Sequence, residues 1–377
     1  RLQQDCNALV GGAFQGDGQV RAALASIVAD NTNASFDRNL LALAGAAQPL
    51  SGGFAGAGLP PGIGFLPQPG GVLWAQESEF DAWSTFIQLG FDDVSRDRST
   101  NEDGFDADRQ AITLGLERRI SDRLSLGAAL GYGRGDVDFT GGSGSQDIDE
   151  TRLQFYASYS AENGVYVDAL ANWQRRGIDQ TRRTSYGLAG GTGVNQAYLA
   201  DFDADSSGVA ATLGYHWQRG GFGLDPFLTL EYASLDVDGY TEVASTPDAA
   251  GAGWAIRASD VDSDLITADV GLRATWAISR ESGVWLPQVE VAYGTVIDQD
   301  EPDSVVQFVG DASDSLGLSA LQFRMLNDAE DDDYFRLGLG LVAQWTGGRS
   351  GFVNVSTRLG ESGYDRTELL LGLRFEF

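Results

Sequence analysis

From about Trp83 to the C-terminus, apolar side chains alternate with small or polar ones in runs of about ten residues. In the first run, Trp83, Ile87 and Phe91 fall on one face, whereas Ser84 and Gln88 fall on the other. A period of two predicts β-strands with one apolar face, as in strands that face lipid outside and a lumen inside. Twelve such runs occur, at residues 83–91, 112–116, 124–132, 153–159, 165–173, 209–215, 228–232, 270–276, 289–293, 337–345, 353–357 and 369–377.

The connections between these runs alternate in length. Short links at 121–122, 161–164, 218–221, 279–283 and 346–350 alternate with long ones at about 95–107, 140–149, 177–205, 238–262 and 297–332. A soluble β-sandwich also alternates in hydrophobicity but has no reason to sort its loops by length. Tight periplasmic turns and long extracellular loops are typical of an outer-membrane barrel, so the sequence predicts an all-β, twelve-stranded antiparallel transmembrane β-barrel over residues 78–377.

Aromatic and charged residues agree with this prediction. Two expected interfacial belts consist of Trp217, Trp276, Trp345, Phe375 and Phe377 at the short-turn end, and of Tyr132, Trp173, Tyr232 and Tyr293 at the other. Many charges fall on the inward faces, where a dry core would make them costly and a polar lumen would not. The expected lumen-lining residues are Glu117, Arg119, Asp168, Asn172, Glu231, Asp269, Arg273, Glu290, Arg336, Arg358 and Arg374.

The N-terminal part has a different character. Residues 17–30 have the apolar spacing of an amphipathic helix, and a second short helical stretch is expected over 39–48. Residues 51–77 are rich in Gly and Pro and predict an extended linker. We therefore expect residues 1–50 to form a helical plug inside or beside the lumen, or the remnant of an exported passenger.

Composition excludes several classes of protein. No stretch approaches the ~18 consecutive apolar residues of a transmembrane helix. The net charge is −29, and all 25 basic residues are Arg, so nucleic-acid binding is not expected. The single cysteine, Cys6, allows no intrachain disulfide. An exported protein needs a signal peptide, which we expect to have preceded Arg1 in the precursor.

Candidate catalytic and metal-binding groups are sparse. His216 is the only histidine, which argues against a Ser-His-Asp triad or a zinc cluster, so we expect no enzyme activity and no cofactor. Spaced aspartates could ligate Ca²⁺ but match no twelve-residue calcium loop, and solvated surface is the alternative. The weak calcium candidates are Asp201, Asp203, Asp205, Asp331 and Asp333.

Two further segments of the predicted loops were considered. Arg175, Arg176, Arg182 and Arg183 could bind lipid phosphates or pair with neighbouring aspartates. The glycine-rich run 187–193 predicts a loop tip rather than a phosphate cradle, because it has neither a lysine nor a strand-to-helix context.

The segment from Asp225 to Glu242 resembles the middle of the autotransporter β-domain of type V secretion. It contains a strand that begins Asp225-Pro226-Phe227 and ends at Tyr232, followed by the run Asp238-Gly239-Tyr240-Thr241-Glu242. The strand pattern partly recurs at Pro287, Val289, Val291 and Tyr293. The resemblance covers about residues 75–377 and implies a twelve-stranded barrel with a preceding helix threaded through its pore.

The C-terminus matches the outer-membrane signature of alternating hydrophobic residues that ends in Phe. Leu373, Phe375 and Phe377 are the expected signal that the barrel-assembly machinery reads. Fewer than about 75 residues precede the barrel, so the passenger has either been cut away or is not part of this protein. Some family members cut at paired asparagines, whereas this chain has Asn31-Thr32-Asn33, and we expect no such cleavage.

The sequence therefore predicts an outer-membrane translocator in a Gram-negative bacterium, with periplasmic barrel termini and extracellular long loops. It would anchor and export an N-terminal passenger, with outer-membrane lipid, lipopolysaccharide and the assembly machinery as partners. The alternatives are a surface adhesin or scaffold that acts through its acidic loops, and a passive pore.

Overall fold

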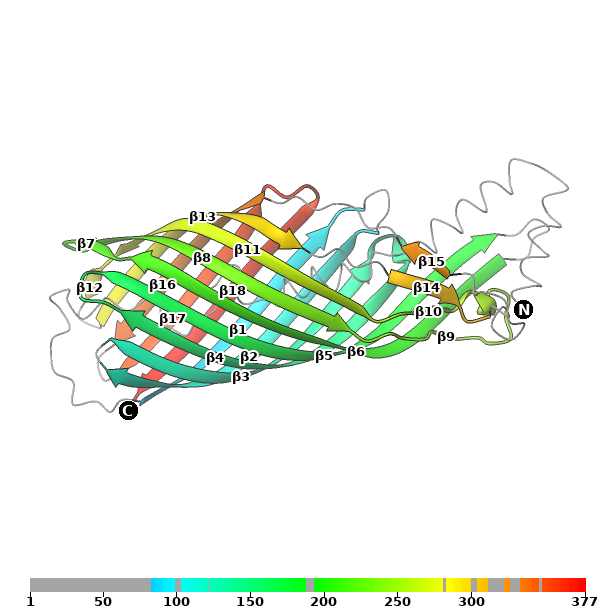
Figure 1. Cartoon of the computed structure of the whole chain (residues 1–377), viewed down its shortest axis with the longest axis horizontal. Coiled ribbons are helices and arrows are strands. Elements are labelled where there is room, and N and C mark those ends of the chain that lie inside the picture. The colour runs from blue at the N-terminus through cyan, green and yellow to red at the C-terminus, as the bar shows by residue number, and fades with distance from the viewer. Residues whose placement is uncertain are drawn as a thin grey trace.

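The alternating runs fold into twelve long antiparallel strands. The computed structural model describes residues 83–98, 103–121, 123–187, 193–280, 283–299, 304–310, 322–325, 333–345 and 348–377 (Figure 1). The long strands are β1 (Trp83–Arg96), β2 (Phe105–Ser121), β3 (Leu124–Phe139), β4 (Gly144–Ser160), β5 (Val165–Gly187), β6 (Gly193–Tyr215), β8 (Phe222–Val237), β11 (Val261–Trp276), β13 (Gly283–Gln299), β16 (Asp333–Trp345), β17 (Arg349–Leu359) and β18 (Tyr364–Glu376).

The sheet closes on itself, which confirms the predicted twelve-stranded barrel. Each long strand pairs with the next one along the chain, and β1 pairs with β18 from Ser84 opposite Glu376 to Arg96 opposite Tyr364. Closure leaves no long strand with an unpaired edge in the barrel wall. Among the described residues, no helix is long and apolar enough to cross a membrane. The expected helical stretches within 1–50 and the linker 51–77 lie outside the described residues.

Short elements mark the two ends of the barrel. The 3₁₀-helix η1 (Thr140–Gly142) links β3 and β4 at the loop end, and the remaining short elements fall into two groups. At the turn end, β7 (Trp217–Arg219) and β12 (Ile278–Arg280) extend the tight turns beside the C-terminus (Figure 1). At the loop end lie β9 (Val243–Ala244), η2 (Ala252–Trp254), β10 (Ile256–Ala258), β14 (Ser304–Phe308) and β15 (Gln322–Met325).

In eight of the long strands the apolar face changes sides along the length of the strand. In β6, Val209, Ala211 and Leu213 face outward, but nearer the loop end the outward positions are aspartates and the apolar side chains, such as Phe202, point inward. The same switch occurs in β1 to β5, β8 and β11. Lipid favours apolar groups outside the barrel, whereas water favours them inside. The switch therefore marks where the wall leaves the hydrocarbon layer.

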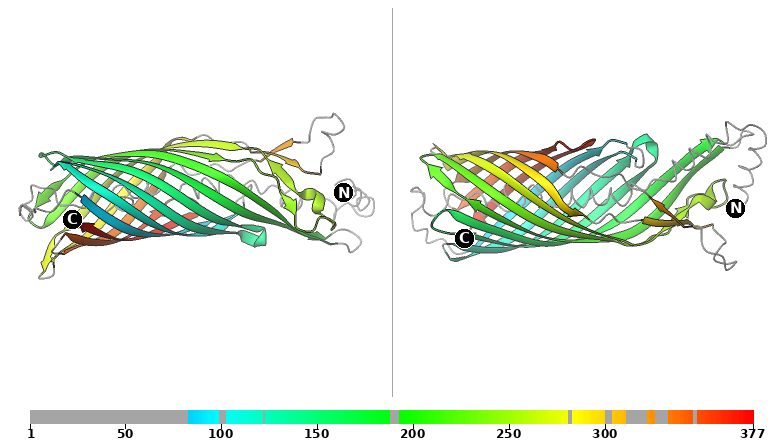
Figure 2. Two further views of the ribbon diagram at one scale, coloured as in Figure 1. Left: turned by 90° about the horizontal axis from the view of Figure 1, so that it is seen from below. Right: turned by 45° about the horizontal axis from the view of Figure 1, so that its top comes forward.

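The expected long loop over 177–205 is wrong. β5 and β6 continue as a paired hairpin up to Gly187 opposite Gly193 and project well beyond the other strands (Figure 2). The expected loop at 140–149 is also mostly strand, because β4 begins at Gly144, and the one at 95–107 is strand at its two ends, up to Arg96 and from Phe105. The prediction missed these parts of the strands because it required apolar residues on the outward face, where these parts have polar residues.

Candidate translocation lumen

Most of the expected lumen-lining residues are buried on the inward face of the wall. Arg358 and Asn172 are half-buried, and Arg119 is exposed because it stands near the end of β2, where the wall stops. The buried ones are Glu117, Asp168, Glu231, Asp269, Arg273, Glu290, Arg336 and Arg374.

One group of buried charges joins strands from both ends of the chain. Arg109 on β2 lies 2.7 Å from Asp92 on β1 and also pairs with Glu150 on β4. Arg366 on β18 lies 3.0 Å from the same Asp92. Arg152 pairs with Glu150 at 3.2 Å. The sequence analysis did not predict a role for these residues. Their place on the inward-facing positions of the alternation could have identified them.

A second group of buried charges lies across β11, β13 and β16. Arg336 pairs with Asp269 at 3.1 Å and with Glu290 at 3.3 Å, and Arg273 pairs with Glu290 at 3.1 Å. The Tyr334 hydroxyl donates to Asp269 at 2.8 Å. Each carboxylate is therefore shared between strands, so that the charges tie the wall together as well as line it.

Two buried charges near these groups lack hydrogen-bond partners among the described residues. Neither carboxylate oxygen of Glu231 accepts a hydrogen bond from a described residue, although Glu231 is only 4% exposed. Both terminal guanidinium nitrogens of Arg176 are likewise without a partner, and its nearest carboxylate oxygen, on Glu150, is 4.0 Å from Nε. A buried charged group that lacks hydrogen bonds is costly, so these two groups indicate where a further polar segment would be stabilised.

His216, the only histidine of the sequence, lies next to an aspartate. Its Nδ1 bonds to Asp225, beside the turn end of β6, and its Nε2 has no partner in the described chain. The wall thus uses the only histidine as a polar pair between β6 and β8.

The four arginines expected in a loop lie on the long hairpin instead. Arg176 and Arg182 point inward and are buried, and Arg175 is exposed but pairs with Asp203 at 2.6 Å. Arg183 is exposed. The alternation of β5 separates these neighbours onto two faces, so they form no common site for lipid phosphate.

The calcium candidates are also strand residues. Asp201, Asp203 and Asp205 lie on the outward face of β6, Asp333 accepts a hydrogen bond from Tyr293, and Asp331 lies outside the described residues. The described chain contains no group of three or more His, Cys, Asp or Glu arranged to hold a metal ion.

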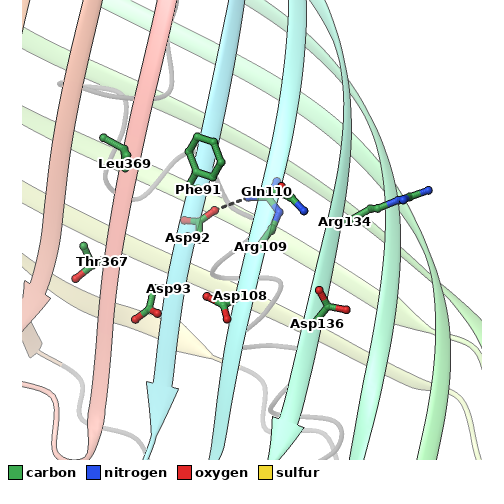
Figure 3. Close-up of a pocket in the computed structure, with 10 residues that line it drawn as sticks. All are labelled: Phe91, Asp92, Asp93, Asp108, Arg109, Gln110, Arg134, Asp136, Thr367 and Leu369. Carbon is green, nitrogen blue, oxygen red and sulfur yellow. Dashed lines mark hydrogen bonds and ion pairs between the residues drawn. The ribbon is translucent and has the colours of Figure 1, made fainter.

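The aspartates instead form a row around the outer wall. Figure 3 shows Asp93, Asp108 and Asp136 side by side on β1, β2 and β3, lining one surface hollow. The register continues the row across three more strands, through Asp147, Asp179 and Asp201. The row lies just beyond the tyrosine belt, where Tyr132 donates to Asp149 at 2.6 Å.

The three residues expected to form the C-terminal assembly signal lie on the closing strand or directly after it. Leu373 and Phe375 belong to β18, Phe377 follows it, and all three side chains are exposed on the outer wall. Phe375 stands opposite Thr85 of β1 and Arg349 of β17.

A contiguous apolar cluster fills the loop end of the barrel. Inward side chains of eight neighbouring long strands contribute to it, among them Val94 and Phe105, together with the connection that follows β8. Its members also include Val306 of β14, which is 1% exposed. The mouth at this end is therefore packed with apolar side chains.

The run Asp238 to Glu242 positions that connection. Tyr240 stacks on Phe202 with ring centroids 4.8 Å apart. A Cβ on Gly239 would meet the nitrogen of Asp260 at 2.9 Å, so the chain needs glycine there. Both carboxylate oxygens of Glu242 bind Arg182 of β5, at 2.8 and 2.6 Å. The segment that carries the resemblance thus folds the connection over the mouth.

Comparisons with known proteins agree with this architecture. The family model "Autotransporter beta-domain" matches residues 85–356. Similar solved structures include the translocator domain of autotransporter NalP from Neisseria meningitidis, with a TM-score of 0.59 and 15% identity over 80% of this chain and 90% of that one. The β-domain of the Bordetella autotransporter BrkA has a TM-score of 0.53 and 16% identity over 79% of this chain and 100% of that one.

Esterase EstA of Pseudomonas aeruginosa is 25% identical over 182 residues, which cover 47% of this chain. The match spans 27% of the length of EstA. The family match extends over well more than half of the chain. The chain therefore belongs to the autotransporter β-domain family and is an outer-membrane translocator barrel of a Gram-negative bacterium.

Proposed function

We propose that this barrel exports a passenger attached to its N-terminus, with the turn end in the periplasm and the loop end outside the cell. The closed wall with its charged lumen carries the proposal, because a polar chain needs such a route through hydrocarbon. Tight turns at one end and folded connections at the other support the orientation. The assembly machinery and lipopolysaccharide are proposed partners.

Residues 17–48 are the proposed occupant of the lumen. They contain Arg21 and Arg38, either of which could pair with the partnerless Glu231, and Asp30, which could pair with Arg176. Charge pairing in a low-dielectric lumen would offset the cost of leaving those groups alone.

We further propose that the barrel has no catalytic activity of its own. Many of its buried charges are engaged in cross-strand pairs, and its histidine bonds to Asp225. The activity named for EstA is not carried over to this chain, because the match spans only 27% of that protein.

Surface exposure of a peptide tag tests export. A tag fused before Arg1 should be cleaved by protease added to intact cells, whereas the same tag after Phe377 should be cleaved only once the outer membrane is permeabilised. An N-terminal tag that stays protected while the barrel fractionates with the outer membrane would contradict export and favour a surface scaffold.

Labelling of Glu231→Cys in a Cys6→Ser background tests the occupant. A water-soluble maleimide should react slowly with the full chain and quickly after deletion of residues 1–70. An outward control, Asp93→Cys, should react equally in both. Equal labelling of Glu231→Cys with and without residues 1–70 would exclude them as the occupant, and high single-channel conductance of the full chain would favour a passive pore.

A further inference from the structure

Exposed arginines without carboxylate partners gather at the turn end of the barrel. Arg118 lies on the outward face of β2 near the end of the strand, and Arg219, Arg280 and Arg349 each stand beside another of the tight turns. All four are exposed, and none has a carboxylate partner among the described residues. They occupy four of the five connections at this end, so they are distributed around the barrel.

At the loop end, three exposed arginines pair with aspartates. Arg134 pairs with Asp149 at 3.1 Å, Arg175 pairs with Asp203 at 2.6 Å, and Arg98 pairs with Asp103. The separation is not complete, because Arg123 at the turn end pairs with Glu162, and Arg183 and Arg257 at the loop end are exposed without a carboxylate partner among the described residues. The aspartates, in contrast, gather at the loop end, where one row of them crosses six strands.

The turn-end arginines stand beside the aromatic belt. The Arg118 guanidinium lies 5.2 Å from the centre of the Trp83 ring. Arg349 is in register with Trp345 on one side and Phe375 on the other, and Arg219 is opposite Phe222. Such aromatic rings sit at the level of lipid headgroups in membranes, and long arginine side chains at that level reach the phosphates.

We propose that these four arginines bind the phosphate groups of anionic phospholipids in the leaflet that surrounds the turn end. Guanidinium groups pair with phosphate in a bidentate way, and each basic residue near an anionic surface strengthens membrane association. The inference rests on the proposed orientation, in which this leaflet faces the periplasm. It assigns lipid-phosphate binding to arginines other than those that the sequence suggested.

Quenching of tryptophan fluorescence tests the proposal. The full chain is folded into vesicles of phosphatidylcholine that contain brominated phosphatidylglycerol, or brominated phosphatidylcholine for comparison. Replacement of Arg118, Arg219, Arg280 and Arg349 by Gln should reduce the preference for the anionic lipid by about fivefold per arginine. Arg98, Arg134, Arg175 and Arg257 replaced by Gln give the same change in net charge and should retain the preference.

Three results would overturn the proposal: a parent chain without preference for phosphatidylglycerol, an equal loss in the loop-end control, or abolition of the preference by excess inorganic phosphate alone. The last would identify free phosphate as the ligand. If the barrel inserts and exports its tag but shows no lipid preference, only the lipid-binding proposal is wrong. If the tag is not exported but the lipid preference is found, only the export proposal is wrong.

Discussion

At the scale of single residues, inward aromatic rings lie flat on glycines of the neighbouring strand. Phe227 of β8 is directly opposite Gly271 of β11, and Tyr156 of β4 is opposite Gly127 of β3. A Cβ on Gly271 would be 2.2 Å from Cζ of Phe227. Because these glycines have no side chain, large aromatic rings can pack directly against the backbone of the inner wall there.

We predict that Gly271→Ala lowers the free energy of unfolding by about 1–3 kcal/mol, because the added methyl group forces the Phe227 ring out of its place. Gly177→Ala is the matched control. Its nearest neighbour, Asp203 Oδ1, is 3.8 Å from the added Cβ, and it should leave stability unchanged. Urea midpoints in lipid vesicles measure both, and equal midpoints for the two variants would refute the packing argument.

The aspartate row predicts opposite effects for two neighbours. Partial burial, followed by the contact with Asp136, raises the pKa of Asp147, whereas the hydrogen bond from Tyr132 lowers that of Asp149. A raised folded pKa contributes stability at pH below the ordinary value near ~4, and that contribution is lost as pH rises through the raised value. A lowered pKa contributes stability above the ordinary value, lost as pH falls through the lowered one.

Asp147→Asn should therefore stabilise the barrel at pH 7 by about 0.5 kcal/mol or less after solvent screening, and the gain should vanish below pH ~4. Asp149→Asn should destabilise it at pH 7. Urea midpoints at both pH values provide the measurement. A loss of stability in Asp147→Asn at neutral pH would show that like-charge repulsion does not govern the row.

At the scale of elements, the sequence predicts strands well where lipid imposes one pattern, and poorly beyond it. Runs such as Leu124 to Tyr132 were readable because their outward face is apolar. The sequence predicts a loop for the outer parts of β5 and β6 because Asp201, Asp203 and Asp205 occupy the outward face, where a lipid-facing strand has apolar residues. A reading that allows the apolar face to change sides would have extended both strands.

The pairs that hold these elements were not predictable in the same way. Arg182 and Glu242 are 60 residues apart, and only the fold brings the hairpin and the connection after β8 together. Likewise, the alternation along β2 and β4 predicts that Arg109 and Glu150 face inward. Their pairing across β3, however, depends on the register and the curvature of the wall.

Arg182→Met should release the connection from the hairpin without unfolding the barrel. It leaves Glu242 buried and unpaired, at a cost of about 3 kcal/mol, so that protease cleavage within 238–260 should become about a hundredfold faster. Arg183→Met, one residue along and exposed on the outward face, is the control. Replacing Glu242 by Met as well should slow cleavage again; unchanged cleavage in Arg182→Met would mean that the ion pair does not hold the connection.

At the scale of the whole molecule, closure joins the two ends of the described chain. β1 and β18 pair along almost their full lengths, and buried charges reinforce the junction from the inside. Arg374 of β18 reaches past β1 to Glu117 of β2, at 2.6 Å, and Arg366 pairs with Asp92. Twelve strands could be counted from the sequence, but the seam contacts follow only once the first and last strands are neighbours.

We predict that Arg374→Gln destabilises the closed barrel by about 3–5 kcal/mol, because Glu117 is left charged in a buried place. Replacing Glu117 by Gln as well should recover part of that loss, since two neutral amides can hydrogen-bond to each other. Arg119→Gln removes an exposed charge close by and should cost less than about 0.5 kcal/mol. Urea unfolding in vesicles, followed by the mobility shift between folded and unfolded barrel, separates these cases. If Arg374→Gln and Arg119→Gln unfolded at the same urea concentration, the seam would be held by backbone pairing alone and the lumen charges would be free to serve the passing chain.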